Sequence, residues 1–116
     1  MGSPIYQPIR VPRYPFAAQV TIHEPATGIE TQGLATDISE GGCFVLTRRL
    51  FPRDTRLTLV IRKKAETLQT PVLVAHSQKE GGMGLKFVEM ADDQEAVLKA
   101  WLDALKPASS LSSLNA

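Results

Sequence analysis

The segment Asp37-Ile38-Ser39-Glu40-Gly41-Gly42 places a carboxylate, a hydroxyl and two glycines within six residues. Asp37 and Ser39 are two residues apart at the expected end of a strand, so both side chains can face the same side. A carboxylate accepts hydrogen bonds from paired N–H donors such as a guanine edge, and a hydroxyl can donate to a phosphate or base oxygen. Adjacent glycines allow positive φ and let a ligand approach the backbone. The same residue types also favour a purely structural role, an Asx turn and a serine cap that stabilise a tight hairpin.

A second group of candidate residues lies in a proline-rich stretch at the start of the chain. Proline fixes φ and removes a hydrogen-bond donor, which predicts an extended N-terminal arm without regular structure over residues 1–15. On this arm, Arg10 and Arg13 can present guanidinium groups to phosphates or stack them on purine faces. A solvated basic arm is the simpler interpretation of these two arginines taken alone.

Segments with strand-like alternation follow the arm, at residues 16–23, 29–38, 43–46, 57–62, 67–77 and 83–88. Most show period-two apolar positions, the pattern of a strand that covers a core with one face. Further along, Val97, Trp101 and Leu105 are spaced by four, which predicts an amphipathic helix from Asp92 to residue 106. We expect Asp92 to be the N-cap of this helix, with Glu95 completing a capping box.

The length of 116 residues fits a single domain. Six short strands followed by one helix predict an all-β fold, a six-stranded antiparallel β-barrel with a C-terminal helix. We expect the barrel and its helix to occupy residues 16–106, and residues 107–116 to form a flexible tail.

Composition argues against several functional classes. A net charge of +1 gives no chain-wide signal for a nucleic acid polymer or an anionic membrane. The single cysteine, Cys43, excludes an internal disulfide and a cysteine-rich zinc cluster, and we expect its thiol to be buried and inert. No apolar run is long enough for membrane insertion and the start does not resemble a signal peptide, which predicts a cytoplasmic protein.

Two further interpretations are weakly supported. Residues 48–64 carry seven basic side chains and one acidic one but a single aromatic, Phe51, so base stacking on RNA is poorly supported. We expect this stretch to be a solvated surface that steers an anionic ligand. A catalytic triad would need Ser39 activated by a histidine, with Asp37 as orienter. No nucleophile-elbow motif surrounds Ser39, which argues against an enzyme.

Taken together, the arginine arm, Asp37-x-Ser39-x-x-Gly42 and the later Gly82-Met83-Gly84-Leu85-Lys86-Phe87 resemble the PilZ domain family. The resemblance covers residues 9 to 106, and the order and spacing of the three motifs are more specific than any one of them. It implies a split-barrel type of six-stranded antiparallel barrel with a C-terminal helix. It also implies a non-enzymatic receptor that binds the bacterial second messenger cyclic di-GMP and relays the signal to a downstream protein partner.

The resemblance also implies roles for individual residues of the barrel. Asp37 and Ser39 match the positions that contact guanine and phosphate, and Gly42 matches the turn glycine. With Gly41, it would let the ligand reach the backbone. His76, near the end of the fifth strand, stands where a side chain can stack on a guanine, although a half-exposed strand histidine is an equally good interpretation.

On the arm, Arg13 matches the second arginine of the family's Arg-x-x-x-Arg motif. The first arginine of that spacing would stand at position 9, which is Ile9, so Arg10 is the candidate for the remaining contact. This departure favours an alternative, a degenerate PilZ-like adaptor that binds proteins and no nucleotide. The resemblance implies no metal and no cofactor other than the ligand cyclic di-GMP, and it leaves the oligomeric state open.

Overall fold

A computed structural model describes residues 11–106 of the chain, so Arg10, Ile9 and the predicted tail lie outside the described residues. Within this range the predicted all-β fold with a C-terminal helix is confirmed. The elements are β1 (Tyr14–His23), β2 (Glu30–Ile38), β3 (Gly42–Thr47), β4 (Arg56–Lys63), β5 (Glu66–Gln78), β6 (Gly82–Phe87) and α1 (Asp92–Leu105).

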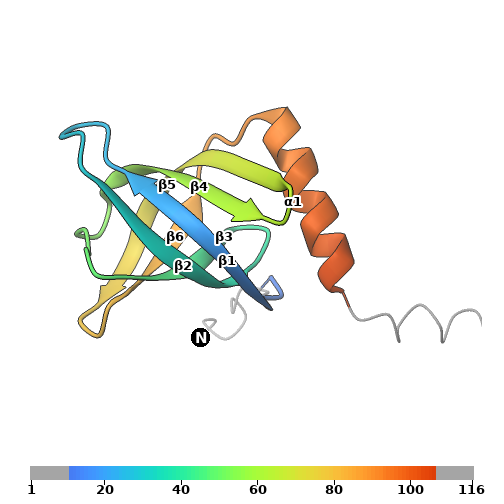
Figure 1. Cartoon of the computed structure of the whole chain (residues 1–116), viewed down its shortest axis with the longest axis horizontal. Helices are drawn as coiled ribbons and strands as arrows, with labels where there is room; N and C mark the ends of the chain where they lie inside the picture. Colours follow the sequence, from blue (N-terminus) through green and yellow to red (C-terminus); the bar gives the residue numbers. More distant parts are fainter. Residues whose placement is uncertain (1–10, 107–116) are drawn as a thin grey trace, which may run out of the picture.

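The six strands close into a barrel in the order β1-β2-β3-β6-β5-β4, and every neighbouring pair is antiparallel (Figure 1). Tight turns join β1 to β2, β2 to β3, β4 to β5, and β5 to β6. The longer loop between β3 and β4 crosses to the opposite part of the barrel. Strand β4 therefore lies between β5 and β1, and β3 pairs with β6 rather than with β4. Closure leaves no free sheet edge among these strands, which protects them from pairing with other chains.

The core of the barrel is filled by the side chains that point inward, which occur at every second position along a strand. Val20, Ile22, Leu57, Leu59 and Ile61 are fully buried and come from the adjacent strands β1 and β4. A slip of one residue in their pairing would turn these side chains to solvent, so the hydrophobic pattern fixes the register. Burying each such side chain stabilises the fold by roughly 1.5–3 kcal/mol before the entropy of ordering is counted.

Helix α1 lies across one end of the barrel (Figure 1) and is held there mainly through Trp101. The Trp101 ring lies 5.4 Å from the Phe16 ring between centroids, and its indole Nε1 donates a hydrogen bond of 2.7 Å to Glu66 Oε1. Lys63 Nζ also lies 5.1 Å from the Phe16 ring centroid. The helix therefore contacts both the first strand and the β4–β5 hairpin.

Most strand boundaries lie within one residue of the predicted ones, and two differences at the ends of the fold are larger or change a predicted role. Strand β1 begins at Tyr14, two residues before the predicted Phe16. The predicted capping box at Asp92 is wrong, because the N-cap is Ala91 and no side chain caps the helix. The acidic residues of the first turn, Asp92, Asp93 and Glu95, instead place negative charge at the positive end of the helix dipole.

We predict that Trp101→Ala lowers the free energy of unfolding by about 3–5 kcal/mol, because it removes a large buried side chain and leaves a cavity between helix and barrel. Lys99→Ala, an exposed change in the same helix, should cost about 0.5 kcal/mol or less. Urea unfolding followed by circular dichroism measures both, since Trp101 is the only tryptophan and its fluorescence is lost with the variant. Equal stability of the two variants would contradict the role assigned to Trp101.

Cys43 gives a prediction about pH. Its side chain is buried in β3, and burial, assisted by the charge of Asp37, raises the pKa of its thiol from 9.0 to about 12. Between these values the folded chain keeps a proton that the unfolded chain has released, so stability should fall as the pH rises. We expect this alkaline loss to be smaller in Cys43→Ala. Urea unfolding of both proteins between neutral pH and about pH 10 tests it, and parallel curves would show that Cys43 is not the group responsible.

Candidate functional site

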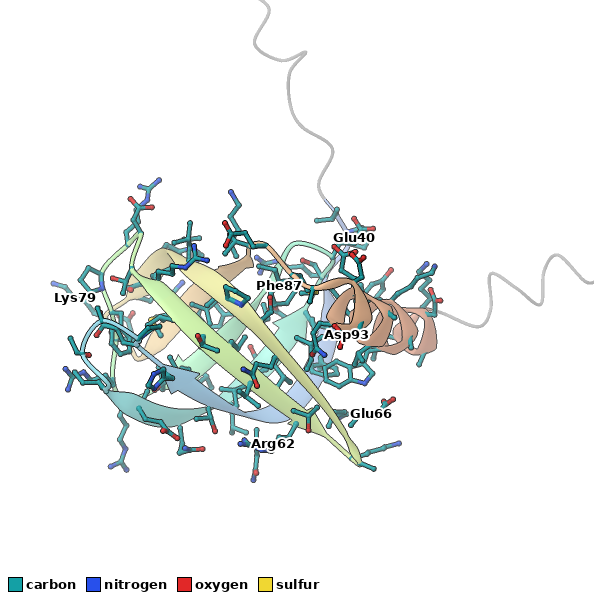
Figure 2. All side chains as sticks on the ribbon, turned by 90° about the horizontal axis from the view of Figure 1, so that it is seen from above. Glu40, Arg62, Glu66, Lys79, Phe87 and Asp93 are labelled. Carbon is teal, nitrogen blue, oxygen red and sulfur yellow. The ribbon has the colours of Figure 1, made fainter. Side chains whose placement is uncertain are left out.

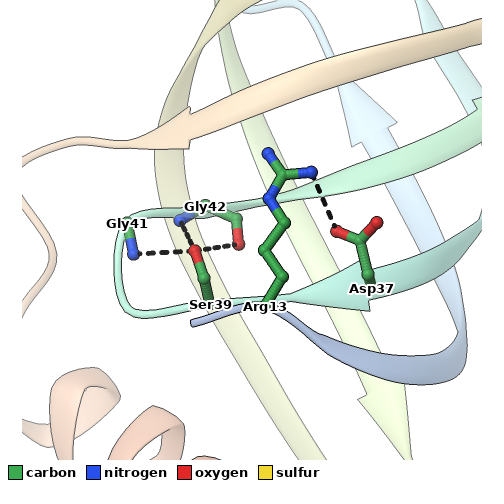
Figure 3. A network of polar contacts seen from close by, with 5 residues as sticks. All are labelled: Arg13, Asp37, Ser39, Gly41 and Gly42. Atoms are coloured by element: carbon green, nitrogen blue, oxygen red, sulfur yellow. Dashed lines mark hydrogen bonds and ion pairs between the residues drawn. The ribbon is translucent and has the colours of Figure 1, made fainter. Parts of the chain in front are cut away.

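The turn between β2 and β3 is organised by the hydroxyl of Ser39. Ser39 Oγ accepts hydrogen bonds from the backbone N–H of Gly41 at 3.1 Å and of Gly42 at 3.3 Å, and it donates to the carbonyl of Gly42 at 3.3 Å (Figure 3). A hydroxyl has one donor and two acceptor lone pairs, so all of its capacity is used inside the turn. Ser39 also follows the last residue of β2 and is buried, so it does not share an exposed strand face with Asp37.

Of the two glycines in this turn, Gly42 is required for space, because the neighbouring strand leaves no room for a side chain there. Among the described residues, the glycines with positive φ are Gly28 and Gly81, so neither Gly41 nor Gly42 uses the positive φ that glycine allows. A Cβ on Gly42 would collide with the backbone carbonyl of Leu85 in the neighbouring strand β6. A Cβ on Gly41 would meet nothing within 4 Å, so the surface there is open.

Arg13 and Asp37 connect the arm to the barrel. Arg13 Nη1 lies 3.6 Å from Asp37 Oδ1 (Figure 3), and 57% of the Arg13 side chain is exposed against 28% of Asp37. An ion pair with so much exposure contributes about 0–1 kcal/mol, so it is easily exchanged for another partner. The same Oδ1 atom is buried and accepts no hydrogen bond from any described residue. Apart from the ion pair with Arg13, this acceptor has no partner, and a ligand with N–H donors that displaces Arg13 could fill it.

Two aromatic rings lie on the outer surface of β6, where glycines leave room for them. The His76 ring contacts Gly84, its partner in the β5–β6 register, and the Phe44 ring contacts Gly82. A Cβ on either glycine would collide with the ring above it. The ring centroids of Phe44 and His76 are 6.1 Å apart, with an angle of 32° between the planes. Of the two rings, His76 lines the cavity that includes the β2–β3 turn, and Phe44 packs beside it.

These groups surround one open cavity of about 650 Å³, within the range typical of small-molecule sites. Five predicted residues line it: Arg13, Ser39, Gly41, Gly42 and His76. Asp37 joins them through its ion pair with Arg13 and does not itself line the cavity, and Arg10 is outside the described residues. The cavity thus combines cationic groups, an aromatic ring and a nearby carboxylate acceptor.

Sequence reasoning did not single out Phe44 or Lys86. Lys86 lines the cavity, and Phe44 packs beside His76. Strand alternation provides a signal for both, because Phe44 lies between the buried Cys43 and Val45, and Lys86 follows Gly84 by two residues on the same face.

The basic stretch 48–64 does not contribute to the cavity lining. Arg56 pairs with Glu89, Arg62 Nη1 donates to Thr21 Oγ1 at 2.9 Å, and Lys63 Nζ donates to the carbonyl of Ala17 at 2.8 Å. These side chains are therefore spread along β4 and hold neighbouring elements.

Other kinds of site receive no support from the described residues. Between residues 11 and 106, no three histidine, cysteine, aspartate or glutamate side chains gather as a metal site would require. The one helix in this range, α1, is too short and too polar to cross a membrane. The hydroxyl of Ser39 is bonded within its own turn, and no described hydrogen bond joins it to a histidine.

Comparison with solved structures finds the same fold. The PilZ domain of YcgR from Escherichia coli, described with c-di-GMP, has 12% identity and a TM-score of 0.68, covering 95% of this chain and all of that chain (100%). The Bacillus subtilis inhibitor of motility MotI/DgrA has 24% identity and a TM-score of 0.66, covering 84% of this chain and 51% of that one. The K. pneumonia MrkH–c-di-GMP complex has 20% identity and a TM-score of 0.68, covering 84% and 52%.

The chain spans about half the length of the MotI and MrkH chains that it matches. No curated protein sequence matches it. The model of the family described as PilZ domain matches residues 8–104. Since this match covers most of the chain and includes both the arm and the barrel, the protein belongs to the PilZ domain family.

Proposed function

We propose that this protein is a non-enzymatic receptor that binds cyclic di-GMP in the cavity between the arm and the outer face of β3 and β6. The observation that carries the proposal is the unfilled, buried Oδ1 of Asp37 beside the exchangeable guanidinium of Arg13. The solved structures of the YcgR PilZ domain and of MrkH, which share this fold, are described with c-di-GMP.

Each side chain then has a separate task. Asp37 accepts hydrogen bonds from the ring N–H and amino group of a guanine. Arg13 leaves the carboxylate and binds phosphate or stacks on a base, and Arg10 of the arm supplies a second guanidinium for the ligand. His76 offers its ring face to the second base. Gly41 and Gly42 keep the surface low enough for the ligand to approach, and Ser39 holds their turn in shape rather than donating to the ligand.

We further propose that the bound state is relayed to a downstream protein in the bacterial cytoplasm. Binding draws the arm onto the barrel through Arg13, which precedes β1 directly. A buried, unpaired cysteine is compatible with a reducing compartment. Neither a nucleic acid polymer nor membrane insertion is needed for this function.

The alternative function is an adaptor that binds proteins and no nucleotide. The observation in its favour is an exposed leucine pair on the barrel wall, because Leu34 and Leu46 face each other across β2 and β3 and are 49% and 46% exposed. Contiguous exposed apolar surface marks protein-binding sites, and this pair would form the centre of one. A receptor that relays its signal also needs such a surface, so the test must be nucleotide binding itself.

We predict that Arg13→Ala weakens cyclic di-GMP binding by about ten- to a hundredfold, the value of a charged hydrogen bond. Its thermal midpoint should be nearly unchanged, because Arg13 is exposed and lies outside the core. Isothermal titration calorimetry of the wild-type and variant chains measures the effect, with Arg53→Ala as an exposed arginine control on the β3–β4 loop. Wild-type affinity in Arg13→Ala would remove Arg13 from the site, and a wild-type chain that binds no cyclic di-GMP would favour the adaptor.

The Asp37 carboxylate should decide which base is bound. Cyclic di-AMP should not compete with cyclic di-GMP, since an adenine edge lacks the paired donors that match a carboxylate. Asp37→Ala should lose most of this preference together with affinity. Competition titrations with the two cyclic dinucleotides report the selectivity directly. Equal competition against the wild-type chain would show that Asp37 does not recognise the base edge.

A further inference from the structure

We propose that Lys86 binds a phosphate of the ligand from the barrel wall, as a second cation of the site that is independent of the arm. This inference rests on the proposed function and adds a residue that neither the arginine arm nor the Asp37-x-Ser39-x-x-Gly42 motif contains.

The position of Lys86 suits this role. Lys86 is exposed on β6 and lines the cavity. Its partner across the β3–β6 ladder is Gly42, the glycine that ends the β2–β3 turn. On the same face of β6, the preceding outward residue is Gly84. Because neither glycine carries a side chain, the long Lys86 stem meets no side chain from them as it extends over the cavity.

The glycine N–H groups and the serine hydroxyl of the turn are already occupied. The N–H groups of Gly41 and Gly42 donate to Ser39 Oγ, and the Ser39 hydroxyl donates back to Gly42. A phosphate needs N–H or O–H donors, and a charged donor gives the strongest bonds. The turn, as it stands, therefore brings the ligand close without supplying the donors that a phosphate requires.

Positively charged side chains in the cavity wall can supply the donors that a phosphate requires. Among the described residues, the basic side chains that line the cavity other than histidine are those of Arg13 and Lys86. Arg13 is paired with Asp37. In the described part of the chain, Lys86 takes part in no ion pair or side-chain hydrogen bond. Its three ammonium donors are thus available in this structure without breaking another contact.

The chemistry of lysine separates its task from that of Arg13. A lysine ammonium is a compact charge on a flexible stem, suited to a phosphate oxygen, and it lacks the planar fork that stacks on a base. Lys86 should therefore contribute affinity and salt dependence, and it should not contribute to the choice between guanine and adenine. It would also supply the site with a positive charge that the arginine motif does not, because Ile9 stands at the first arginine position of that motif.

The experiment is a calorimetric titration of the full chain with cyclic di-GMP at low and high salt. We expect Lys86→Ala to bind about tenfold more weakly, the effect of losing one charged hydrogen bond. The loss should shrink as salt rises, because salt screens the charge in the wild-type chain. Lys86→Arg should keep most of the affinity. The preference over cyclic di-AMP should be the same in all three proteins.

Lys79→Ala is the matched control. Lys79 is an exposed lysine in the β5–β6 turn, at the end of the barrel away from Glu40 and the candidate site (Figure 2). Binding by Lys86→Ala that equals binding by Lys79→Ala would overturn the inference while leaving the proposed function intact. So would a loss of base selectivity in Lys86→Ala. A wild-type chain that binds no cyclic di-GMP would overturn the proposed function and this inference together.

Discussion

The close approach of β3 and β6 is the constraint on which the candidate site depends. Gly42 meets the Leu85 carbonyl so tightly that any side chain there would force the strands apart. Further along β6, the rings of Phe44 and His76 pack over Gly82 and Gly84, which have no side chains. The same pairing closes the barrel, since it joins β3 to β6, two strands that are not consecutive in the sequence. One strand pair therefore both completes the fold and places the open Gly41–Gly42 turn and the His76 ring on the same cavity.

The contact between the arm and the barrel at the site is weak enough for a ligand to replace it. The Arg13–Asp37 pair is partly exposed, and its separation of 3.6 Å is longer than a good charged hydrogen bond. The turn below it is held by three hydrogen bonds of Ser39 and does not need the arginine. A ligand can thus displace Arg13 from Asp37 without disturbing the turn or the core. A receptor requires this combination of a barrel that keeps its structure and an arm whose contact with the barrel can change.

The strands and the helix could be predicted from the sequence because their signals are local. Alternation located β1 within two residues, and spacing by four located α1, whose Trp101 packs on Phe16. The arrangement of the site was less predictable. Ser39 turns toward its own backbone, where it accepts hydrogen bonds from the glycine N–H groups, and the residue types alone do not determine this choice. Lys86 comes to lie beside Gly42 through the β3–β6 register, more than forty positions away in sequence.

Backbone amide NMR of the full chain during titration with cyclic di-GMP tests the central claim most directly. If the cavity is the binding site, the amide resonances of Gly41, Gly42 and Gly84 should shift and saturate together. Those of Lys79 and Gly81, in the turn at the far end of the barrel, should stay where they are. Unchanged spectra at high ligand concentration, or shifts confined to that far turn, would contradict the account.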